Sequence, residues 1–222
     1  MKSSTLRLTL RVLTKEIVGS LRFKTAWAAM LMFCLTTLAA VGLSLQGTLL
    51  SPEIAAPLLW VIIFFGSMAG TDRIFAEEAA SGTLPALLIY GDAAPILWGK
   101  FLFTLLMLLI LTLFIVPLFL LLLSVDVADF MLLIAAVILG VIGIAAAGTL
   151  IAALTISASV RGGLFPVLML PVILPVFLPA IALTKGALTG AGDFSLAFAM
   201  LLYDAILALG ASVLFDYLWY EE

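Results

Sequence analysis

Six long runs of apolar residues dominate the pattern of hydrophobic and polar positions along the chain. Each run is close to the roughly 20 residues that a helix needs to cross the hydrocarbon core of a bilayer. The runs predict membrane-spanning helices at Ala26–Leu45, Ile54–Gly70, Ile96–Ser124, Phe130–Ile156, Leu164–Leu183 and Ser195–Leu218. A transmembrane β-barrel would show segments of about ten residues with alternating polarity, and the runs do not alternate. The pattern therefore predicts an all-α integral membrane protein with six transmembrane helices in a single domain, residues 1–222.

The segment before the first run has the period of an amphipathic α-helix. One face carries five apolar residues: Leu6, Leu10, Leu13, Ile17 and Leu21. Basic residues recur beside that face at four-residue spacing, at Arg7, Arg11 and Lys15. A basic amphipathic helix lies flat on the inner membrane surface, with its cations toward anionic lipid. We predict an interfacial elbow helix over residues 1–25, which is either a charged anchor alone or also part of a docking surface.

Composition and charge predict that the chain is a membrane protein and how it is oriented in the membrane. Hydrophobic residues make up 65% of the chain and charged residues 10%, with a mean hydropathy of +1.36. Ordinary soluble domains carry about 25% charged residues, so a soluble globular protein is excluded. Of the ten Lys and Arg residues, nine lie before the first span or in the loops after spans two and four, and only Lys185 lies on the other side. Positive charge favours the cytoplasm, which predicts that both termini are cytoplasmic.

The loop between spans two and three, residues 72–95, is the polar segment with the clearest sequence signals of local structure. Gly82 suits the left-handed end of one short helix, and Thr83 can cap the next. The second helix would present a short apolar face made by Leu84, Leu87 and Leu88. Such a cytoplasmic helix is either a connector that rests on the bilayer or a knob that fits a groove in a partner protein.

Three further features stand out within the spans. Span five contains Pro171, Pro175 and Pro179 at four-residue steps; each proline removes a helical hydrogen bond, which predicts a broken helix that either lines a path or only packs. Asp204 lies inside span six, where a carboxylate is costly and suggests a functional site, with a packing role as the alternative. The glycines of span four, at 140, 143 and 148, predict a surface for close helix packing.

Several kinds of site are absent from the sequence. The chain has no histidine, which excludes histidine-ligated haem and catalytic pairs built on histidine. It also has no phosphate-binding glycine-rich loop and no cluster of metal ligands. We therefore expect no enzymatic activity, no metal site and no nucleic-acid partner, with any nucleotide hydrolysis carried out by a separate protein.

The order of short motifs resembles that of a known family. The loop resembles the coupling segment of type-2 ABC exporter permeases, although Pro85 or Ala86 stands where that segment commonly has an acidic residue. Within this superfamily the chain is most similar to the haem exporter protein B (cytochrome c maturation protein B) family. The residues that carry the resemblance are Leu58–Trp60, Asp72–Phe75, Glu77–Leu88, Pro95, Gly99–Lys100, Arg161–Leu164 and Leu170–Pro179.

The resemblance implies a permease subunit in the bacterial inner membrane that serves haem export or haem-chaperone release in c-type cytochrome biogenesis. It implies three protein partners: an ABC ATPase subunit, a haem-handling membrane subunit and a small single-span subunit. ATP would act through the ATPase, haem is a possible cargo, and no cofactor is expected on this chain. The resemblance places the ATPase contact at Glu77, Glu78, Gly82, Thr83, Leu84, Leu87 and Leu88.

Two alternatives remain at this stage. One is a type-2 ABC permease for lipid, polysaccharide or drug export. The other is a membrane transporter or scaffold that works without an ATPase, in which Asp204 would be the coupling carboxylate.

Overall fold

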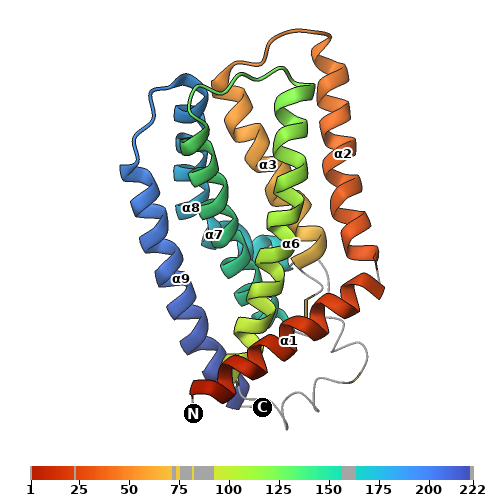
Figure 1. Ribbon diagram of the computed structural model, residues 1–222, viewed down its shortest axis with the longest axis vertical. Helices are drawn as coiled ribbons and strands as arrows, with labels where there is room; N and C mark the ends of the chain where they lie inside the picture. Colours follow the sequence, from red (N-terminus) through yellow and green to blue (C-terminus); the bar gives the residue numbers. More distant parts are fainter. Residues whose placement is uncertain are drawn as a thin grey trace.

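A computed structural model of the chain describes residues 2–22, 24–71, 74–75, 82, 93–156 and 164–220, and all the regular structure in these ranges is helical (Figure 1). The helices are α1 (Lys2–Arg22), α2 (Thr25–Leu45), α3 (Pro52–Thr71), α6 (Ala93–Leu122), α7 (Phe130–Ile156), α8 (Leu164–Thr189) and α9 (Ser195–Tyr220). Six of them, α2, α3 and α6 to α9, are long and apolar enough to cross a membrane. The predicted all-α fold with six spans is confirmed.

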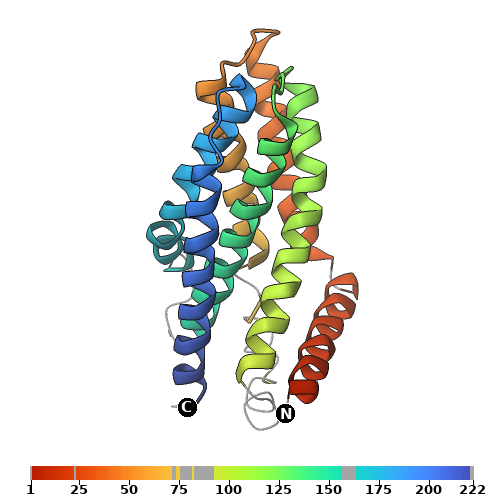
Figure 2. The same ribbon diagram turned by 60° about the vertical axis from the view of Figure 1, so that its left-hand side comes forward.

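The six long helices run side by side, and both chain termini lie at one end of the bundle (Figures 1 and 2). We call this the terminal end, and the end with the loops at 46–51 and 190–194 the opposite end. α7 packs against four of the other long helices, α3, α6, α8 and α9. α2 lies at the edge of the bundle, where it packs mainly on α3.

Small residues of α7 make this packing possible, as predicted. A Cβ atom on Gly140 would lie 2.0 Å from Cη2 of the buried Trp60 on α3. A Cβ atom on Gly143 would lie 2.7 Å from both Asp204 Oδ1 on α9 and Val176 Cγ1 on α8. Interiors are packed too densely to absorb such overlaps freely, so glycine at these positions sets how closely the neighbouring helices approach.

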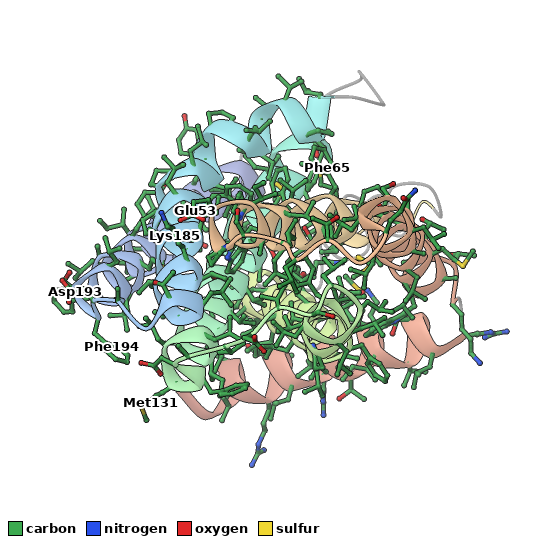
Figure 3. All side chains as sticks on the ribbon, turned by 90° about the horizontal axis from the view of Figure 1, so that it is seen from above. Glu53, Phe65, Met131, Lys185, Asp193 and Phe194 are labelled. Atoms are coloured by element: carbon green, nitrogen blue, oxygen red, sulfur yellow. The ribbon has the colours of Figure 1, made fainter. Side chains whose placement is uncertain are left out.

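Side chains at the opposite end fix where helices begin and how far they extend. Asp129 Oδ1 accepts a hydrogen bond from the Leu132 N–H at 3.0 Å, which caps the start of α7. α8 continues beyond the predicted end at Leu183, because Thr184 is buried and its Oγ1 accepts a hydrogen bond from Trp60 Nε1 at 2.8 Å. The next residue, Lys185, reaches Glu53 of α3 at 3.3 Å (Figure 3).

α1 crosses α6 obliquely at the terminal end (Figures 1 and 2). The predicted amphipathic helix is present, but its apolar face is divided between two environments. Leu13 and Ile17 are partly buried and pack against the core. Leu6, Leu10 and Leu21 are 50–65% exposed, beside the exposed Arg7, Arg11 and Lys15. The exposed leucines suit contact with lipid, and nitrogen-tipped side chains extend outward from this helix (Figure 3).

Candidate functional site

Most of the predicted ATPase contact lies outside the described residues. This is the case for Glu77, Glu78, Thr83, Leu84, Leu87 and Leu88. Gly82 is described: it is exposed, its φ is +69°, and a Cβ atom there would meet nothing within 4 Å. That conformation favours glycine, in agreement with the predicted left-handed position.

The start of the loop after α3 is fixed inside the bundle. α3 ends at Thr71 and α6 begins at Ala93, both toward the terminal end (Figure 1). Ile74 and Phe75 form a turn, and both are buried, with exposed fractions of 6% and 1%. The Ile74 N–H donates to the Thr71 carbonyl at 3.4 Å. The first described residues after α3 are therefore an anchored turn.

A buried lysine holds this turn in place. Lys100 is fully buried near the start of α6. Its Nζ donates to the Ile74 carbonyl at 2.5 Å and to Glu16 Oε1 of α1 at 3.0 Å. The same nitrogen lies 4.5 Å from the centre of the Phe75 ring, within cation–π range. One ammonium group thus connects three separate segments, and we call this set (Glu16, Ile74, Phe75 and Lys100) the lysine junction.

Two neighbouring contacts complete the lysine junction. A Cβ atom on Gly99 would lie 2.6 Å from Val12 Cβ and 3.1 Å from the Thr9 carbonyl, so glycine lets α1 approach α6 closely enough for Glu16 to reach Lys100. In addition, the Phe75 ring lies 5.9 Å from the ring of Phe215 on α9. These contacts explain the Gly99-Lys100 pair, which carried part of the family resemblance: Gly99 lets α1 approach α6, and Lys100 binds Glu16.

Sequence reasoning identified Lys100 as part of a motif but missed its partner Glu16. The two residues are 84 positions apart, and no local pattern connects them. The only signal in the sequence was that Glu16 is acidic in a helix whose other charged residues are basic.

Asp204 forms a second buried site, between α9 and its neighbours α7 and α8. The residue is 6% exposed, and neither carboxylate oxygen has a hydrogen-bond partner among the described residues. Its side chain faces Gly143, and Val176 of α8 borders the same glycine. Buried polar groups in proteins are nearly always hydrogen-bonded, so this carboxyl group is an exception that packing alone does not explain.

The three prolines of α8 do not break the helix, contrary to the expectation from the sequence. α8 is continuous from Leu164 to Thr189, with Pro171, Pro175 and Pro179 inside it. Pro171 and Pro175 are exposed and Pro179 is partly buried, so the proline face points away from the interior of the bundle. Tyr203 OH donates to the Val172 carbonyl at 2.8 Å, which joins α9 to the proline-containing part of α8.

Comparison with known proteins gives the family. No relative among the curated proteins matches the sequence. The family model described as CcmB protein matches residues 7–215, a range that begins in α1, includes the lysine junction and Asp204, and ends in α9. The chain therefore belongs to the CcmB family of multi-pass membrane proteins, which acts in haem export for cytochrome c biogenesis.

Proposed function

We propose that this chain is the permease subunit of an ABC-type complex that serves haem export or haem-chaperone release in c-type cytochrome biogenesis. The observation that carries the proposal is the family match over residues 7–215, which includes the whole 72–95 loop. The complex lies in the bacterial inner membrane, with both termini of this chain in the cytoplasm.

The proposed partners follow from what this chain lacks in its sequence. It has no phosphate-binding loop, so an ABC ATPase subunit hydrolyses ATP for the complex. A haem-handling membrane subunit and a small single-span subunit complete the assembly. The chain has no histidine with which to ligate haem, so we assign it a conformational role in releasing the haem chaperone, with haem as a possible cargo and no cofactor of its own.

The proposed contact with the ATPase is the Glu77–Leu88 segment. Two observations support this choice: the segment follows the anchored turn at Ile74 and Phe75, and Gly82 within it is exposed in a left-handed turn. Because its base is fixed, a displacement of this segment by the ATPase would be transmitted to the helices of the bundle. Its Leu84, Leu87 and Leu88 side chains would fill an apolar groove of the ATPase.

The double variant Leu84→Ala, Leu87→Ala tests the proposed contact. Each truncation removes apolar contacts worth about 1–3 kcal/mol at an interface, and every 1.4 kcal/mol lowers affinity about tenfold. We expect less ATPase subunit to co-purify with the chain and less holo-cytochrome c to form in cells. The matched control is Leu43→Ala, Leu49→Ala, because Leu43 and Leu49 are 80% and 77% exposed toward the opposite end. Full ATPase association and normal cytochrome assembly in the Leu84/Leu87 variant would show that the contact lies elsewhere.

A further inference from the structure

We propose that Lys100 is a positioning residue: it fixes the base of the ATPase-docking loop to the elbow helix α1, so that the two move as one unit. This inference rests on the proposed function, because the loop transmits force only if a partner docks on it. The claim about position concerns this chain alone.

The contacts of Lys100 join three separate segments of the chain. The Ile74 carbonyl belongs to a turn outside any helix, Glu16 belongs to α1, and Lys100 itself is in α6. The three segments do not belong to one helix, so helical backbone hydrogen bonds do not connect them. The ammonium group donates to both oxygen atoms and lies against the Phe75 ring.

A lysine at this position is a poor choice for stability alone. Removing an ammonium group from water costs several kcal/mol, and well-packed apolar residues often stabilise a protein as well as a buried ion pair does. An apolar side chain of similar length could fill the same space beside the Phe75 ring. It would leave the Ile74 carbonyl and the Glu16 carboxylate without a common donor, so the register between the turn and α1 would be lost.

The lysine junction is also connected to α9. The Phe75 ring contacts Lys100 and, in addition, the ring of Phe215 on α9. A displacement of the loop base would therefore act on α1, α6 and α9 together. This arrangement turns a local contact with the ATPase into a movement of several helices.

Lys100→Met is the main test, made in the full complex with the ATPase subunit. Methionine keeps an unbranched apolar stem and removes the ammonium group. Spin labels at Arg11→Cys on the exposed face of α1 and at Ser81→Cys in the loop, in a Cys34→Ala background, report their mutual distance. We expect a broader distance distribution than with Lys100, retained ATPase co-purification, and a fall in holo-cytochrome c of about tenfold, within the range of typical coupling energies.

Lys185→Met is the matched control, because Lys185 is a half-exposed cation that pairs with Glu53 toward the opposite end. It should leave the distances and the cytochrome yield unchanged. Glu16→Gln keeps the shape of the junction on its more exposed side and should broaden the distribution less than Lys100→Met does. Combining the two changes should add little to Lys100→Met alone, because Lys100→Met already removes the donor of the contact with Glu16.

Wild-type distances and yield in Lys100→Met would overturn the inference. If that variant fails to accumulate in the membrane, Glu16→Gln decides the question, and wild-type distances and yield in it would overturn the inference equally. Failure of the proposed function has a different signature: the unmodified chain would bind no ATPase subunit, whatever residue stands at position 100.

Discussion

At the scale of single residues, two buried ionisable side chains have opposite surroundings. Lys100 has a carboxylate, a carbonyl and an aromatic ring around its ammonium group. Asp204 has no hydrogen-bond partner among the described residues and lies beside Gly143. The fold accounts for the lysine and leaves the aspartate without a partner. This difference makes Asp204 the residue whose charge most needs a direct test.

Asp204→Asn removes the possibility of a negative charge while it keeps the size of the side chain. A volume-conserving change in a packed interior usually costs less than about 1.5 kcal/mol of stability. Membrane insertion of the variant should not be impaired, because the substitution removes a charged residue that costs about 2.5–3.5 kcal/mol at the centre of a span on insertion scales. We expect normal expression and nearly normal holo-cytochrome c, measured by haem staining, because no hydrogen-bond partner among the described residues depends on a charge at this position.

Asp204→Leu is the companion variant: two methyl groups replace the smaller carboxylate oxygens beside Gly143, and this overpacking should reduce the amount of folded protein. A chain with Asp204→Asn that assembles normally but forms no holo-cytochrome c would contradict the packing role. That result would favour a charge-dependent step.

At the scale of elements, the lengths of the spans were predictable and their packing partners were not. Bilayer thickness fixes how many apolar residues a span needs, so the ends of α2, α3 and α7 agree with the apolar runs to within two residues. The run that ended at Leu183 missed the end of α8, because Thr184 and Lys185 are polar yet find partners on α3. Glu16 and Lys100 come together only when α1 folds across α6.

Glycines at helix contacts give a prediction for one pair of elements, α2 and α3. A Cβ atom on Gly66 would lie 2.3 Å from Sγ of the buried Cys34, with its next neighbours at 3.8 Å. Gly66→Ala should therefore lower stability by about 1–3 kcal/mol through overpacking, measured as a lower thermal unfolding midpoint in detergent. Cys34→Ala removes the clashing atom and should restore most of the loss.

Gly210→Ala is the control for this series, because nothing lies within 4 Å of a Cβ atom there. Replacing an unhindered helical glycine by alanine should raise stability by up to about 1 kcal/mol. Equal effects of Gly66→Ala and Gly210→Ala would mean that helix propensity, and not the contact between α2 and α3, determines the outcome.

At the scale of the whole molecule, positive charge is distributed unevenly between the two ends of the bundle. The basic residues of α1 and the lysine junction lie toward the terminal end, whereas Lys185 lies toward the opposite end, where it pairs with Glu53. The pairing leaves little free positive charge there among the described residues. The structure thus places both termini together at the positively charged end, as the loop charges indicated.

Reporter fusions determine that compartment. Positive residues near span ends are retained in the cytoplasm, so we expect the terminal end, with the docking loop, to be cytoplasmic. A reporter inserted at Gly82 should show cytoplasmic activity, and reporters at Gly47 and Gly190 should show periplasmic activity. All three glycines have positive φ values in turns, where insertions disturb the helices least. A periplasmic reporter at Gly82 would invert the topology, and the loop could then not meet an ATPase, since ATP is supplied in the cytoplasm. The same result would remove the basis for both the docking segment and the coupling role of Lys100, so this measurement should come first.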